Sequence, residues 1–167
     1  MLTVSLPWMF GIMEGKGDEP MNILVSACLL GENCKYSGGN NLAEGLQEEL
    51  TARGIGIVPV CPECAGGLPT PRVPAERLGD RVVNKVGEDV TAQFMAGAQT
   101  ALEAAKAHNC QYAILKKNSP SCGCGTIYDG TFTGVLTAGD GVTAELLKQH
   151  GIAVYNEDTY KEMLANP

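Results

Sequence analysis

The sequence is short of histidine and of basic residues, and each shortage narrows the range of functions. The two histidines, His108 and His150, lie in the last turns of predicted helices, where the helix dipole favours a cationic ring. We therefore expect structural histidines, not a cysteine–histidine nucleophile pair or a histidine-rich metal site. The 12 lysines and arginines against 19 acidic residues give a net charge of −7. This charge disfavours a general nucleic-acid-binding protein, because neutralising phosphates requires a basic face.

The sequence also lacks a secretory signal and a long apolar run. The apolar stretch at residues 2–13 has no basic segment before it and no small-residue cleavage site, and it is shorter than the ~20 residues of a membrane helix. We expect a cytoplasmic protein without a membrane partner. Residues 1–20 are predicted to be an N-terminal extension, dispensable or due to an early start codon. A strand or helix packed on the core is the alternative.

The rest of the composition is that of a globular domain with an unusual number of cysteines. A chain of 167 residues with 44% apolar and 19% charged residues can fold as one domain without disulfide bonds, here residues 21–167. The seven cysteines are an odd number. Without a secretory signal, they indicate metal-binding or catalytic thiols in a reducing compartment.

Apolar runs that are typical of buried strands alternate with helical patterns. Strands are predicted at residues 23–27, 55–60, 81–86, 112–115 and 152–155, and helices at 41–53, after Asp89, at 142–150 and at 158–165. Pro59 places the second strand near a sheet edge. Asp129 and Gly130 predict a hairpin with a type I′ turn over residues 127–132. The alternation predicts a single-domain three-layer α/β sandwich with a mainly parallel sheet, plus this small hairpin.

Three cysteines follow three of the predicted strands. Cys28 and Cys61 come directly after the first and second apolar runs, and Cys122 lies a few residues beyond the run at 112–115. Ligands of open parallel sheets bind beyond the carboxyl ends of the strands, so we expect these thiols at one rim. Soft sulfur ligands select zinc, copper(I) or iron–sulfur clusters. A buried, unreactive cysteine is the alternative for any one of them, and it suits Cys110 best.

Other candidate functional residues surround these cysteines. Glu63, two residues after Cys61, is the best candidate for a general acid or base, with a solvated loop carboxylate as the alternative. Arg72 could clamp a carbonyl or anion, or pair with Glu76 to hold the rigid loop at residues 66–76. The lysines at 116 and 117 could offset the charge of a cluster or simply be solvated.

Two further hypotheses use the Cys-x-x-Cys pair at residues 61–64. A non-catalytic zinc module would take its four ligands from Cys61, Cys64, Cys122 and Cys124. A thiol-redox protein would need the first thiol at a helix N-terminus, which lowers its pKa. The glycine-rich residues 65–69 are a poor helix start, so this hypothesis ranks last.

Six motifs resemble those of a known family and occur in the same order. They are SACLLG at 26–31, CPE at 61–63, GGLPTPR at 66–72, SPSCG at 119–123, IYDGTF at 127–132 and GDGVTA at 139–144. They resemble the bacterial domain-of-unknown-function family that includes the thiouracil desulfurases. The resemblance extends from residue 21 to about residue 157, which is nearly the whole chain beyond the extension.

The resemblance implies an enzyme that carries an oxygen-sensitive [4Fe-4S] cluster at the carboxyl ends of the strands. The implied ligands are Cys28, Cys61 and Cys122, with Glu63 as the acid or base and Ser119 assisting proton transfer or positioning the base. The unligated iron would take the sulfur of a thiocarbonyl, and water would replace that sulfur at carbon. The implied substrate is a small thiolated nucleobase or related compound, not a nucleic acid polymer. Additional thiols lie beside these motifs, namely Cys34, Cys64 and Cys124.

Overall fold

A four-stranded parallel sheet forms the centre of the protein. The computed structural model describes residues 20–166, so the predicted extension lies almost entirely outside the described residues. The sheet has the order β2-β1-β5-β8 and consists of β1 (Asn22–Ser26), β2 (Gly56–Val60), β5 (Tyr112–Ile114) and β8 (Ala153–Tyr155). Each of these strands coincides with a predicted apolar run. The strand that contains Pro59 lies at a sheet edge, as predicted.

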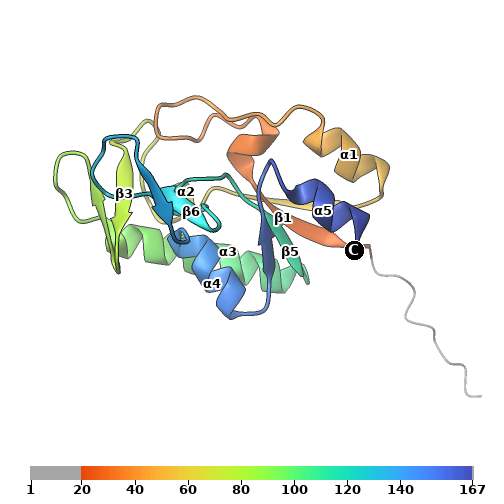
Figure 1. Cartoon of the computed structure of the whole chain (residues 1–167). Helices are drawn as coiled ribbons and strands as arrows, with labels where there is room; N and C mark the ends of the chain where they lie inside the picture. The colour runs from red at the N-terminus through yellow and green to blue at the C-terminus, as the bar shows by residue number, and fades with distance from the viewer. Residues whose placement is uncertain (1–19, 167) are drawn as a thin grey trace, which may run out of the picture.

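Helices cover both faces of the sheet (Figure 1). On one face lie α1 (Leu46–Ala52) and α5 (Tyr160–Ala165), and on the other lie α3 (Thr91–Ala107) and α4 (Val142–Gln149). Successive side chains of β1 point to opposite faces, so Ile23 and Val25 pack in the first layer and Leu24 in the second. The predicted three-layer sandwich is confirmed. Within residues 20–166, none of the helices has the length and apolar character needed to span a bilayer.

Two antiparallel hairpins stand beside the sheet. One joins β3 (Ala75–Leu78) to β4 (Arg81–Asn84), and the other joins β6 (Thr126–Tyr128) to β7 (Leu136–Ala138). The second hairpin was predicted. The predicted type I′ turn is wrong, because that turn has two residues between the strands, whereas here residues 129–135 connect them. The Asp129 carboxylate accepts hydrogen bonds from the backbone and hydroxyl of Thr131, which forms a local turn within a longer loop.

Several elements differ from the sequence prediction. The helix expected at residues 41–53 begins only at Leu46, because Gly45 before it has the left-handed φ of 83°. The 3-10 helix η1 (Ala27–Leu30), the one-turn helix α2 (Pro62–Ala65) and strand β3 were not predicted. All three are short and lie next to the predicted rim of the sheet.

The strand order places a crevice at the carboxyl ends of β1 and β5. From β1 the chain moves outward to β2 and then returns past β1 to β5 and β8. The connections therefore diverge between β1 and β5, and such a switch point is where open parallel sheets bind ligands. Element η1, helix α2 and the loop after β5 all begin at this rim.

Candidate functional site

A cavity of about 530 Å³ lies at this rim. It is lined by all five residues predicted for the site: Cys28, Cys61, Glu63, Ser119 and Cys122. The hairpins form the opposite wall, which includes Glu76 and Phe132. Its volume is within the range of small-molecule sites. Segments that are far apart in sequence thus meet around one space.

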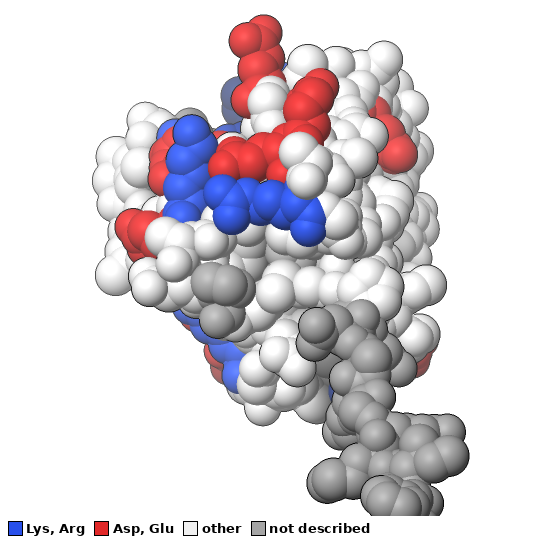
Figure 2. Space-filling view, turned by 90° about the vertical axis from the view of Figure 1, so that its right-hand side faces the viewer, with Lys and Arg blue, Asp and Glu red and all other residues white. Residues whose placement is uncertain are grey.

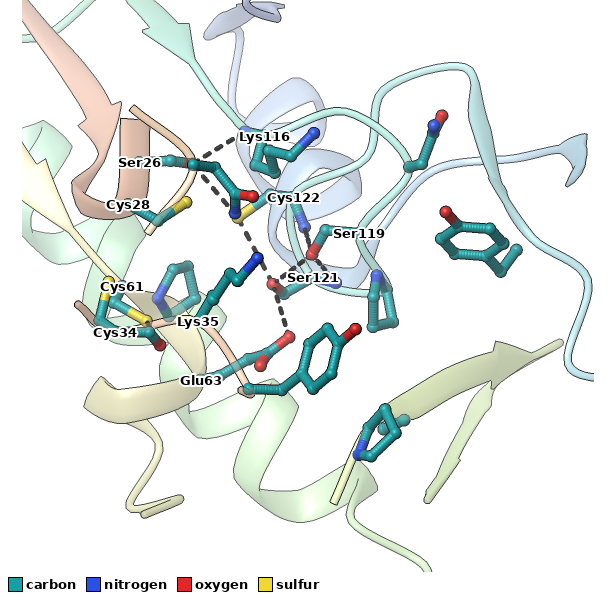
Figure 3. A pocket seen from close by; sticks show the side chains of 18 of the residues that line it. Ser26, Cys28, Cys34, Lys35, Cys61, Glu63, Lys116, Ser119, Ser121 and Cys122 are labelled. Carbon is teal, nitrogen blue, oxygen red and sulfur yellow. Dashed lines mark hydrogen bonds between the residues drawn. The ribbon is translucent and has the colours of Figure 1, made fainter. Parts of the chain in front are cut away.

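The three cysteines reach the cavity from three different elements. Cys28 lies in η1, Cys61 is the N-cap of α2, and Cys122 lies in the loop after β5. Figure 3 shows the sulfur atoms of Cys28 and Cys122 turned toward the same space. Burial raises the pKa of the Cys28 and Cys61 thiols and raises that of Cys122 to about 12. These three thiols are free, so they can serve as thiolate ligands once a metal compensates the cost of their charge.

The thiol donors of the cavity favour a cluster over a single metal ion. Within residues 20–166, no three cysteine, histidine, aspartate or glutamate side chains are close enough to share one metal ion. Zinc needs four ligands around one point, whereas the cysteines of a cubane cluster each bind a different iron and stand apart. Cys124 also lies elsewhere, with its sulfur 3.4 Å from the carbonyl oxygen of Val154. The zinc hypothesis is therefore not favoured, and the donor set fits an iron–sulfur cluster.

Two additional thiols lie beside Cys61. The carbonyl oxygen of Cys34 accepts hydrogen bonds from the thiols of Cys61 and Cys64, at 3.6 and 3.8 Å. The expectation that no helix starts at Cys61 is wrong, because Pro62 at the first helical position favours the short helix α2. Burial nevertheless raises the pKa of Cys61, the opposite of what an exchange-active thiol needs. The redox hypothesis is not favoured.

The carboxylate of Glu63 is held by Arg72. The Nε and Nη2 atoms of Arg72 lie 2.7 and 2.6 Å from Oε2 of Glu63. The same guanidinium donates to the carbonyl oxygen of Cys34 at 2.9 Å. The alternative pairing of Arg72 with Glu76 is wrong, because Glu76 accepts hydrogen bonds from the backbone of Gly130 and Phe132 instead. Arg72 thus joins the loop of Cys34 to the acidic group of the cavity.

Two serines extend from Glu63 across the cavity. The hydroxyl of Ser121 lies 3.4 Å from Oε1 of Glu63 and 3.0 Å from the hydroxyl of Ser119 (Figure 3). Ser119 therefore reaches Glu63 through Ser121, which is only 2% exposed. The hydroxyl of Ser121 also lies 3.4 Å from the sulfur of Cys122. Sequence reasoning missed Ser121, although its place in the motif at 119–123 was a signal.

Glycines allow the surrounding helices to approach these segments closely. A Cβ atom on Gly97 of α3 would overlap the carbonyl oxygen of Pro62, so the glycine lets α3 pack directly against α2. A Cβ atom on Gly141, at the start of α4, would overlap the backbone of Ser121. The amide of Val142 donates to the carbonyl oxygen of Pro120 and fixes the same loop. These contacts set the positions of Glu63 and Cys122.

Most of the charges around the cavity are paired. Lys116 and Lys117 form ion pairs with Glu157 and Asp158, at 2.8 and 2.7 Å. Both lysines are therefore ion-paired, and the positive charge of Lys116 also acts to lower the pKa of the Cys28 thiol, against the larger effect of burial. On the face that Figure 2 presents, a short stripe of basic side chains lies directly against acidic ones.

Comparisons with known proteins identify the family of the chain. A family model described as 2-thiouracil desulfurase matches residues 23–159. The uncharacterized protein YbbK of Bacillus subtilis (strain 168) is 43% identical over 152 residues, which cover 85% of this chain and 99% of that protein. The solved structure of the [4Fe-4S]-dependent thiouracil desulfidase TudS (DUF523Vcz) matches with a TM-score of 0.82 and 48% identity, over 87% of this chain and 96% of the other. The chain belongs to the 2-thiouracil desulfurase family.

Proposed function

We propose that the protein is a [4Fe-4S]-dependent desulfurase that hydrolytically removes sulfur from a thiolated nucleobase or a related small thiocarbonyl compound. The observation that supports this proposal best is that three free thiols from three strand ends share one cavity with a carboxylate held by Arg72. In the proposal Cys28, Cys61 and Cys122 hold the cluster. When bound, the cluster supplies an iron without a cysteine ligand, a Lewis acid suited to soft sulfur.

The residues of the chain supply the proton chemistry. Glu63 accepts a proton from a water molecule that adds to the thiocarbonyl carbon, while Arg72 keeps the carboxylate oriented. Ser121 and Ser119 form the hydrogen-bonded path along which a proton can pass toward the leaving sulfur. A carbon–oxygen bond forms, the carbon–sulfur bond breaks, and hydrogen sulfide leaves. Thiocarbonyl plus water gives carbonyl plus hydrogen sulfide, so no external electron carrier is needed.

The first experiment is anaerobic purification and cluster reconstitution, followed by a sulfide-release assay with thiouracil and its nucleoside and nucleotide forms. We expect brown protein that contains iron and acid-labile sulfide and releases sulfide from at least one of these compounds. Glu63→Gln should keep the iron and lose turnover by ~10² to 10⁴-fold, the usual contribution of general acid–base catalysis.

The control for charge removal is Glu162→Gln, because Glu162 is exposed on α5, outside the cavity. This variant should turn over at the wild-type rate. Colourless protein with one stoichiometric zinc would contradict the proposed cofactor, and full activity of Glu63→Gln would remove Glu63 from the mechanism.

A further inference from the structure

We propose that Lys35 is a further catalytic residue, whose ammonium group contacts the substrate and stabilises the negative charge that develops as water adds to the thiocarbonyl. This inference rests on the proposed desulfurase function. Lys35 follows Cys34 in the loop after η1 and lines the same cavity as Cys28, Cys122 and Glu63. Figure 3 shows its side chain reaching into the space that these residues enclose.

Lys35 differs from Arg72, Lys116 and Lys117, which also line the cavity, because its charge has no protein partner. Arg72 is paired with Glu63, and Lys116 and Lys117 are paired with acidic residues after β8. Among residues 20–166, the ammonium of Lys35 has neither an ion pair nor a hydrogen bond. Lys35 is half-buried, whereas Lys85, the other lysine of the lining without an ion pair, is exposed.

The loop holds Lys35 in a defined position. Its backbone N–H donates to the carbonyl oxygen of Gly39, and its own carbonyl oxygen accepts from Gly38. The preceding carbonyl oxygen, that of Cys34, accepts from Arg72 at 2.9 Å. A Cβ atom at Gly39 would lie 3.3 Å from Cε of Lys35, so the absence of a side chain there leaves room for the lysine stem. Lys35 is thus anchored to the same guanidinium that orients Glu63.

The reaction needs a cation at this place. When water adds to the carbon of C=S and Glu63 takes its proton, the sulfur and oxygen of the substrate become more negative. A fixed donor aimed at developing charge stabilises the transition state more than the ground state. The ammonium does this as a compact point charge and keeps its own proton throughout. Glu63 therefore accepts the proton of the water molecule, and Lys35 stabilises the negative charge that forms on the substrate.

Substitutions test this role with a matched control. Lys35→Met should keep wild-type iron, acid-labile sulfide and visible spectrum, while kcat for sulfide release falls by ~10² to 10³-fold, as for loss of an oxyanion-stabilising donor. Lys35→Arg, which retains the charge, should recover a large part of this loss. Lys106→Met removes an exposed lysine of α3 outside the cavity and should leave kcat unchanged. A kcat for Lys35→Met equal to that of the wild type would overturn the proposal, and so would loss of iron from this variant.

A second measurement does not depend on turnover. The cluster-loaded protein is treated with acetic anhydride under anaerobic conditions, with and without saturating uracil, and the labelled lysines are mapped by mass spectrometry. Uracil should protect Lys35 and leave Lys106 labelled, whereas equal labelling of Lys35 in both samples would contradict contact with the substrate. A wild-type protein that releases no sulfide contradicts the proposed function. An active wild type with an equally active Lys35→Met contradicts only this inference.

Discussion

The two sides of the cavity are built in different ways. We call the segments after β1, β2 and β5, with Cys28, Cys61 and Cys122, the thiol floor. The hairpin wall comprises the β3–β4 and β6–β7 hairpins. The floor continues the buried sheet, is hydrogen-bonded to α4 and packs against α3, whereas every residue of β7 is exposed and Leu136 is 45% exposed. The difference indicates that the packed core holds the thiols of the floor in place. Substitutions in the hairpin wall should therefore disturb the fold less than substitutions in the floor.

The largest effect is expected at the floor itself. Cys122→Ala should lose most of the cluster iron and all measurable sulfide release, because it removes a proposed ligand. Cys124→Ala is the matched control: it removes a thiol two positions away, whose sulfur contacts the carbonyl oxygen of Val154 outside the cavity lining. It should keep iron and activity close to wild type. Iron retained by Cys122→Ala, or lost equally by both variants, would contradict the proposed ligand set. Iron and acid-labile sulfide after anaerobic purification provide the measurement.

A smaller effect is expected where a helix supports the floor. In Gly97→Ala the new methyl group meets the carbonyl oxygen of Pro62 and pushes α2 away from α3. Overpacking of this kind costs about 1–3 kcal/mol of unfolding free energy. Because α2 carries Glu63, a displacement of ~1 Å should also lower kcat by about 10 to 100-fold.

Urea unfolding and steady-state kinetics measure the two consequences of Gly97→Ala. Gln99→Ala, an exposed position on the same helix, should change neither. If Gly97→Ala unfolds and turns over like the wild type, the close packing of α2 on α3 does not fix the floor.

The sequence was sufficient to predict the floor because its signals are local. Buried strands such as β1 and β5 read as apolar runs, and a cysteine after such a run must lie at the carboxyl end of the sheet. The helix at α1 was overestimated because Leu42 fits the helical period, although Gly45 takes a left-handed φ that interrupts it. Strand β3 was missed because it is defined by antiparallel pairing with β4, which sequence periodicity does not show.

The partners within the site could not be predicted in the same way. Arg72 lies four residues from Glu76 and nine from Glu63, so local spacing favoured the wrong carboxylate. The loop folds back over α2 and brings Arg72 to Glu63, a contact that depends on tertiary structure. Lys35 was missed for the same reason. An ammonium outside any recognised motif becomes informative only when its neighbours in space are known.

The smallest effect is expected on the hairpin wall, at Glu76. Its Oε1 accepts hydrogen bonds from the backbone amides of Gly130 and Phe132, at 3.0 and 3.1 Å, and Phe132 has a left-handed φ of 58°. Glu76→Gln keeps an acceptor oxygen but loses the charge, so these bonds weaken and unfolding free energy should fall by about 1 kcal/mol. Because Phe132 lines the cavity, KM for thiouracil should rise by about 3-fold, which is less than 1 kcal/mol of binding.

For Glu76→Gln the decisive comparison is between KM and kcat, with Glu162→Gln as the control for loss of charge. Iron content and kcat should stay at wild-type values, because the hydrogen bonds of Glu76 go to the backbone of Gly130 and Phe132, whereas Glu63 is held by Arg72. A fall in kcat as large as that of Gly97→Ala would mean that the hairpin wall positions the reacting groups as strongly as the floor does. If only KM changes, the hairpin wall contributes to substrate binding and not to the chemical step. A substitution that raises KM and leaves kcat unaltered has removed an interaction that is equally strong in the ground state and the transition state.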